Sequence, residues 1–192
     1  MKSRERILNS LKSANSIDID LPQILFSSGE DNILQTFVEM ATLAGMEVFD
    51  ATKIDLMELL TSCAESKKVQ SSIESHAIRF PILLDEEKPF ETENVPDIFV
   101  CQAHFGVAEN AALWLDDEVL PSRLLAFLPE ELVILLSKEQ LVSNMHQAYD
   151  KVEQIDYTYG LFLAGPSKTA DIEQTLVTGA QGAKRVKLFL QE

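Results

Sequence analysis

The sequence predicts an α/β domain in which a mostly parallel sheet is flanked by helices. Apolar residues between positions 31 and 72 alternate between helical spacing and short extended runs, in the order helix, strand, helix, strand. This order is typical of a parallel sheet with crossover helices. The run at 131–136 is apolar after its first residue, as expected of a central strand buried on both faces. With 192 residues and 46% hydrophobic content, the chain is long enough for one substantial core.

The N-terminal segment is expected to stand outside this domain. Residues 3–13 carry apolar side chains on one side of a short helix, which is too small to be stable alone. We expect this helix to pack against the domain or against another subunit. The polar stretch 13–23 is typical of a linker. The predicted division is therefore a helix and linker at 1–23 and an α/β domain at 24–192.

The first half of the domain contains two predicted helices and two predicted strands. Residues 31–44 have helical apolar spacing and are followed by a strand at 46–49. Asp55 and Glu58 have the spacing of a capping box at the start of the second helix. A short strand is expected at 69–72. Helix and strand thus alternate along this half of the chain.

The middle of the chain is less regular. Residues 75–94 are rich in proline and charge, which favours an insertion or an irregular antiparallel piece, and His76 within them is given no function. Strand character resumes at 97–101. After the apolar run, residues 141–152 show helical spacing, with Ser137 or Ser143 as the capping residue.

The C-terminal part is interpreted as a βαβ unit. The apolar run 160–164 is followed by a turn, and Thr169 then occupies the position of an N-cap for a short helix at about 170–177. Gly179 suits the left-handed end of that helix, and 185–190 is the closing strand. The strand-to-helix loop of such a unit lies at the carboxyl edge of the sheet, where open α/β folds bind ligands.

This predicted loop supplies most of the candidate ligand-binding residues. A helix start beside a lysine suits anions, whereas the nearby carboxylates would suit a ligand that carries a cation, a metal held through them, or helix capping alone. These alternatives stay open. The candidate residues in the loop are Gly165, Ser167, Lys168, Thr169, Asp171 and Glu173.

Two further candidates come from the middle of the chain. Glu109 is flanked by apolar and small residues, so it is either a carboxylate at the edge of an apolar surface or a solvent-facing residue of an alternating strand. Arg123, after Pro121, has the planar guanidinium that pairs with Glu109 or binds a substrate carboxylate, unless it is an ordinary surface arginine. Glu109 is the catalytic candidate and Arg123 a ligand-binding one.

Composition limits the partners and the compartment. The net charge of −15 and a pI near 4.5 argue against binding to nucleic acid or to an anionic membrane. Cys63 and Cys101 are isolated from each other, so we expect neither a disulfide nor a metal or iron–sulfur site. No signal peptide and no apolar run of about 18 residues is present, which predicts a soluble cytoplasmic protein. The sequence identifies no cofactor.

Three segments carry a family resemblance. They are 165–173, with Leu176, Gly179 and Gly182 after it, and then 107–115 and 121–129. In their order along the chain and in their spacing, these segments resemble the LUD-domain family, the LutC or YkgG group of lactate-utilisation proteins. The resemblance is strong over 97–192. It implies a Rossmann-like sandwich similar to the NagB, RpiA and CoA-transferase folds.

The resemblance also implies a role in oxidising L-lactate to pyruvate together with iron–sulfur partner proteins. The leading hypothesis is a small anionic metabolite or cofactor bound at Ser167, Lys168 and Thr169. A non-catalytic subunit that docks onto a partner is the alternative. A transferase or hydrolase with Glu109 as nucleophile is a third reading.

The chain departs from the family pattern at three places. The usual Thr-Gly-Thr appears as Asn110-Ala111-Ala112, and two family histidines are replaced, one near Leu132 and one at Gln181. Loss of both imidazoles removes the obvious acid–base groups. The member is therefore expected to have altered or no catalysis, unless those histidines are structural.

Overall fold

The computed structural model describes residues 3–12, 32–83, 94–172 and 175–192. The predicted domain boundary after residue 23 lies outside these ranges. No helix within them is long and apolar enough to cross a membrane.

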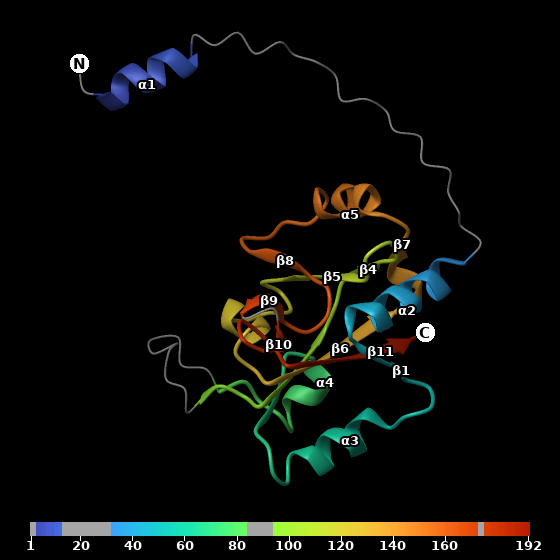
Figure 1. The fold of residues 1–192 in the computed structure, drawn as a ribbon. Helices are drawn as coiled ribbons and strands as arrows, with labels where there is room; N and C mark the ends of the chain where they lie inside the picture. The colour runs from blue at the N-terminus through green and yellow to red at the C-terminus, as the bar shows by residue number, and fades with distance from the viewer. Residues whose placement is uncertain (1–2, 13–31, 84–93, 173–174) are drawn as a thin grey trace.

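A five-stranded sheet forms the centre of the domain (Figure 1). Every neighbouring pair in it is parallel, which confirms the predicted mostly parallel α/β architecture. In spatial order its strands are β1 (Glu47–Asp50), β11 (Arg185–Gln191), β6 (Glu131–Ser137), β3 (Ile98–Gln102) and β2 (Val69–Ser71).

A second, four-stranded sheet packs over one face of the first. Its β4 and β5 form an antiparallel hairpin, β7 joins β4 in parallel, and β8 joins β5 antiparallel. In spatial order its strands are β7 (Leu141–Val142), β4 (Phe105–Val107), β5 (Ala112–Asp116) and β8 (Gly160–Leu163).

Helices complete the layers on both sides of the sheets. The opposite face of the parallel sheet carries α3 and α4, and the outer face of the second sheet carries α5 (Figure 1). A further helix, α2, packs into the core shared with β5 and β6. The bounds are α2 (Ile33–Ala44), α3 (Leu56–Cys63), α4 (Glu74–Ala77) and α5 (Met145–Val152). Because side chains alternate along a strand, β6 supplies Leu132, Ile134 and Leu136 to the core shared with α2 and β5. Val133 and Leu135 of the same strand pack toward α3.

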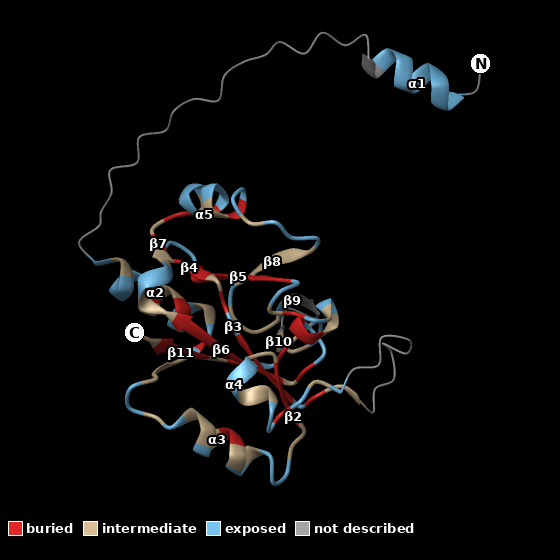
Figure 2. Ribbon diagram, turned by 180° about the vertical axis from the view of Figure 1, so that it is seen from behind, coloured by how far each residue is buried: buried red, intermediate tan, exposed pale blue. Residues whose placement is uncertain are grey.

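Several local predictions are confirmed. The N-terminal helix is α1 (Ser3–Lys12), whose residues 3–10 are all exposed (Figure 2). The side chain of Asp55 accepts a hydrogen bond from the Glu58 amide at 3.1 Å, so it caps α3. The run at 131–136 is the central strand β6, buried along its length. Packing of α1 against the domain or a second subunit stays a prediction.

The predicted helix at 170–177 is wrong. This stretch forms an antiparallel pair of strands, β9 (Lys168–Ile172) and β10 (Thr175–Thr178), so Thr169 caps no helix. The likeness to a cap was outweighed by β-branched residues, which restrict helical rotamers and favour extended backbone. Those in the two strands are Thr169, Ile172, Thr175, Val177 and Thr178.

The end of the chain is also not a βαβ unit. β8 pairs antiparallel with β5 in the second sheet, whereas β11 lies between β1 and β6 in the first. The chain therefore changes sheets between the two strands. Gly179, assigned to the end of a helix, instead has φ 79° in the turn that follows β10.

The helix predicted at 141–152 begins later than expected. Leu141 belongs to strand β7, and α5 starts at Met145 with Asn144 as its cap. Ser137 caps the short 3₁₀ helix η4 (Lys138–Gln140) instead. In the irregular stretch after residue 74 the structure shows the short helix α4, and residues 84–93 lie outside the described part.

Candidate functional site

The predicted ligand-binding loop, which begins at Gly165 and is called the signature loop below, lies at the amino edge of the parallel sheet. It is hydrogen-bonded to the segment that precedes β11: the Ser167 amide donates to Ala183 O at 2.9 Å, and the Gly179 amide donates to Ser167 O at 2.9 Å. The Gln181 amide donates to Ser167 Oγ at 3.3 Å. The predicted position at the carboxyl edge is therefore wrong. The loop follows β8, which belongs to the second sheet, so the rule for parallel strands does not apply to it.

The glycines of this loop permit close packing. Gly165 has φ 83°, a conformation that strains any residue with a Cβ. A Cβ there would also lie 2.7 Å from the carbonyl oxygen of Ala44, at the end of α2. A Cβ on Gly182 would lie 3.2 Å from Ser167 Cβ. The glycines thus hold the loop against α2 and against the chain leading to β11.

A hollow of about 310 Å³ opens beside this loop; most of its lining residues are apolar, but polar atoms make up the larger part of the surface that faces the hollow. Its polar side chains, among the residues described, come from Ser167, Lys168 and Gln181. Lys168 Nζ donates to Ala44 O at 2.5 Å, and an ammonium group has further N–H donors. An apolar hollow with a few convergent polar groups is the usual form of a small-molecule site. We call it the amino-edge pocket.

Both positions at which the resemblance expects histidine contribute to the amino-edge pocket. Leu132, near the first of these positions, comes from β6, and Gln181, at the second, comes from the turn before β11. The pocket therefore brings the signature loop together with two of the three places at which the chain departs from the expected pattern. The described residues that line this pocket include no imidazole, which is the side chain most often used for acid–base chemistry.

Glu109 lies elsewhere. It is exposed in the turn between β4 and β5, and its Oε1 accepts a hydrogen bond from the Met145 amide at 3.0 Å, at the start of α5. Glu109 is not among the residues that line the amino-edge pocket. The structure thus does not bring it together with the loop, and the role that its contacts support is the capping of α5.

Ala111, in the same turn, has φ 55°. Few residues other than glycine adopt this conformation readily. The resemblance expects glycine within the block 110–112, and the structure shows a turn there whose backbone suits glycine.

Arg123 lies beside the amino-edge pocket but does not line it. It begins the 3₁₀ helix η3 (Arg123–Ala126), whose Ala126 forms part of the wall. The Arg123 guanidinium stacks over the Tyr159 ring, 4.8 Å from its centroid. Among the ion pairs of the described residues, none joins Arg123 to Glu109.

The remaining candidates are in or next to β9. Thr169 faces Val177 across the β9–β10 pair. Asp171 also belongs to β9, but its side chain and the whole of Glu173 lie outside the described part of the structure. Their expected contribution stays a prediction.

A second cleft lies at the carboxyl edge of the parallel sheet. Its volume is about 770 Å³, and its walls include residues at or just after the ends of three parallel strands: Ser72 after β2, Gln102 at the end of β3, and Gln140 in η4 after β6. This is the edge at which open α/β sheets bind ligands. We call it the carboxyl-edge cleft.

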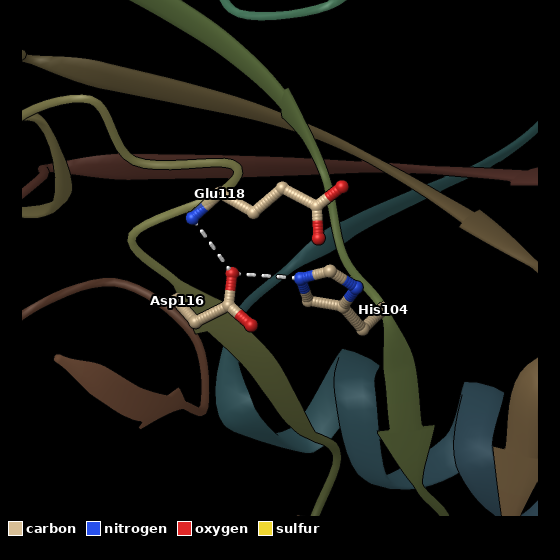
Figure 3. Close-up of side chains that lie close together, drawn as sticks. All are labelled: His104, Asp116 and Glu118. Atoms are coloured by element: carbon tan, nitrogen blue, oxygen red, sulfur yellow. Dashed lines mark hydrogen bonds and ion pairs between the residues drawn. The ribbon is translucent and has the colours of Figure 1, made fainter. Parts of the chain in front are cut away.

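Three side chains of metal-ligand type lie close together at the carboxyl-edge cleft (Figure 3): His104 and Glu118 line the cleft, and the buried Asp116 lies behind them. His104 Nε2 lies 2.8 Å from Asp116 Oδ1, which also accepts a hydrogen bond from the Glu118 amide at 3.0 Å. The Glu118 carboxylate points toward the same imidazole, and one ligand atom from each of the three residues lies within 4.8 Å of the others. Asp116 is buried, whereas Glu118 is exposed.

Sequence reasoning missed this cluster. A usable signal exists: His104 comes shortly after a predicted buried strand, so it belongs at the carboxyl edge. Asp116 ends the next apolar run. Only the β4–β5 hairpin, which returns the chain to this edge, places the two side by side.

Comparison with known proteins places these features in a family. The model of the LUD domain matches residues 91–190. Lactate utilization protein C 1 of Bacillus mycoides is 24% identical over 187 residues, covering 84% of this chain and 80% of its own. An uncharacterised protein of Neisseria meningitidis serogroup B is also 24% identical, over 96% of this chain and 91% of its own.

A solved structure supports the fold. The crystal structure of a DUF162 family protein from Deinococcus radiodurans matches with a TM-score of 0.53 and 15% identity, covering 82% of this chain and 95% of that chain. At this identity the likeness concerns the fold alone, and it agrees with the predicted α/β sandwich.

Proposed function

Because the chain belongs to the LUD-domain family, we propose that it acts in lactate utilisation and binds a small carboxylate, such as L-lactate or pyruvate, in the amino-edge pocket. The name of the Bacillus mycoides relative supports the role. The pocket supports the ligand, because one ammonium group and two uncharged polar side chains converge there among apolar residues. A carboxylate needs such a cation when it leaves water.

Lys168 is the observation on which the ligand proposal rests. Its contact with Ala44 O fixes the ammonium near the end of α2, where a positive charge also suits the helix dipole. Ala44 O is the partner of this group that the described residues show, and an ammonium group has further N–H donors that suit a carboxylate. Arg123 offers a second cation close to the same wall, currently stacked on Tyr159.

Electron transfer is proposed to require partner proteins. Oxidation of a 2-hydroxy acid to a 2-oxo acid releases electrons, and an iron–sulfur cluster is usually held by about four cysteine thiolates. This chain has only Cys63 and Cys101. Cys101 is fully buried, and desolvation raises the pKa of its thiol to about 12. We therefore propose that iron–sulfur partner proteins accept the electrons, as the family resemblance implies. We also propose that this protein and its partners act in the cytoplasm.

Binding is tested by calorimetric titration of the full chain with L-lactate, pyruvate and phosphate. We expect a carboxylate to bind the wild type, and Lys168→Gln to weaken it about 10-fold or more, since a hydrogen bond to a charged group contributes roughly 1.5–3 kcal/mol. Lys184→Gln is the matched control, because Lys184 is exposed and pairs with Glu130 at 3.6 Å. Equal affinity in Lys168→Gln and the wild type would refute the assignment.

One observation favours the second candidate, a non-catalytic interaction subunit. Phe127 and Leu128 are adjacent and are 44% and 48% exposed, and Phe127 also lines the amino-edge pocket. Adjacent exposed apolar side chains mark contact surfaces more often than isolated ones do. Co-purification with iron–sulfur lactate-utilisation proteins, compared between wild type and Phe127→Ser, tests this: unchanged recovery of the partners would count against docking through this surface.

A further inference from the structure

We propose that His104, Asp116 and Glu118 form a binding site for a divalent first-row transition-metal cation in the carboxyl-edge cleft. This site is independent of the amino-edge pocket and of the carboxylate proposed to bind there. It rests on the donor set, on a buried carboxylate whose only ion-pair partner among the described residues is an imidazole, and on access from solvent.

The donor set suits such a cation. One imidazole and two carboxylates present ligand atoms within 4.8 Å of one another, so a modest side-chain adjustment brings all three onto one ion. Imidazole nitrogen favours zinc, iron, cobalt and related metals over calcium and magnesium, which prefer oxygen alone. The three residues come from different segments, but the β4–β5 hairpin and its following turn hold them together.

A buried negative charge supplies a second argument. The described buried acids are Asp116 and Glu131, which are 1% and 3% exposed. Glu131 has two cationic partners, Arg185 at 2.9 Å and Lys187 at 2.8 Å. The ion pairs of the described residues give Asp116 only His104, at 2.8 Å.

This contrast shows what Asp116 needs. A buried carboxylate is costly unless a positive charge and hydrogen bonds compensate it. The Glu118 amide supplies a hydrogen bond but no charge. A metal ion shared with His104 and Glu118 would supply the charge, in the place that arginine and lysine occupy at Glu131.

The cluster is also accessible. The His104 side chain is 24% exposed, and His104 and Glu118 both line the carboxyl-edge cleft. A metal bound by three protein groups keeps coordination positions for water or a ligand, and these would open into the cleft. Glu74 lines the same cleft and adds negative charge that favours a cation.

Cobalt is a suitable probe because its binding can be followed by both calorimetry and visible absorption. The tag-free full chain, stripped of metals with a chelator, is titrated with Co²⁺ alone. We expect one ion per chain in the wild type. His104→Gln and Asp116→Asn should abolish this binding, and Glu118→Gln should weaken it at least about 10-fold, since even indirect partners of a metal change affinity by about 10–100-fold.

Matched controls separate this site from adventitious binding. His146→Gln removes an exposed histidine on α5, and Glu139→Gln removes an exposed carboxylate on η4; both should bind Co²⁺ as the wild type does. Glu118 is exposed, so its variant should stay folded, which circular dichroism verifies. Absence of Co²⁺ binding by the folded wild type, or wild-type affinity in Glu118→Gln, would overturn the proposal.

Discussion

The two edges of the parallel sheet have opposite chemistry. The amino-edge pocket is lined by apolar residues together with Ser167, Gln181 and one ammonium group, from Lys168. The carboxyl-edge cleft is larger, and its charged side chains are those of Glu74, Glu118 and, when protonated, His104. One edge is suited to a small anion and the other to a cation.

The buried acids of the two edges show the same contrast. Glu131 begins β6 at the amino edge and is paired with Arg185 and Lys187. Asp116 lies at the carboxyl edge and contacts an imidazole. The fold thus surrounds one buried carboxylate with two cationic side chains and gives the other an imidazole and a backbone amide.

The largest loss of stability is expected from a cavity-creating substitution in β6, the central strand that runs from one edge to the other. Ile134 is 0% exposed in the middle of β6, and Ile134→Ala should lower the free energy of unfolding by about 2–5 kcal/mol through lost burial and a cavity. Urea unfolding followed by circular dichroism measures this. A loss below about 0.5 kcal/mol, the range of a surface substitution, would show that the two edges do not share one core.

The next effect concerns the compensated acid. Burial raises the pKa of Glu131, but hydrogen bonds and charges from Lys187 and Arg185 outweigh it and leave that pKa below its ordinary value near 4.5. Since a lowered native pKa stabilises the fold above the unfolded-state pKa, this stabilisation is present at neutral pH and is lost as pH falls through the native pKa.

Glu131→Gln should therefore cost about 1.5–3 kcal/mol at neutral pH. The difference from the wild type should shrink as the pH falls below 4.5. Urea unfolding at both pH values measures it. A difference that stays constant would mean that the carboxylate charge contributes nothing.

Gly165→Ala should separate the two edges. The positive φ and the approach to Ala44 O should make the substitution cost about 1–3 kcal/mol and displace the loop that carries Lys168. Binding of a carboxylate should be lost while Co²⁺ binding is kept, both measured by calorimetry. Loss of Co²⁺ binding with retained carboxylate binding would reverse the assignment of the edges.

Asp55→Ala should have the smallest effect. It removes the cap of α3, on the opposite face of the sheet, and should lower the free energy of unfolding by about 1 kcal/mol. Thermal and urea unfolding measure the loss. Both binding reactions should be unchanged at a temperature where the variant is folded; a change in either would show that α3 influences the edges.

Local patterns predicted much of the fold. Three predictions that rest on strong local patterns are confirmed: the helix from the apolar spacing of 31–44, the cap at Asp55, and the strand β6 from its apolar run. The stretch at 170–177 was mistaken because a threonine after a turn has the same appearance before a helix and in a strand. Pairing between β9 and β10 stabilises the extended conformation of this stretch. Such pairing is not visible in a local sequence pattern.

The sites were harder to predict, for a related reason. Ser167 and Lys168 were identified from the sequence, and the structure places them with Gln181 in one pocket. Their edge was misassigned because nothing local shows that β8 belongs to the second sheet. His104 and Asp116 are separated along the chain and meet only through hairpin register.

Calorimetric titration of pyruvate into Lys168→Gln and metal-free Glu118→Gln tests the separation of the two edges most directly. We expect Lys168→Gln to lose about 10-fold or more in affinity, the equivalent of one charged hydrogen bond, and Glu118→Gln to bind as the wild type does. Wild-type affinity in Lys168→Gln together with lost binding in Glu118→Gln would contradict this separation.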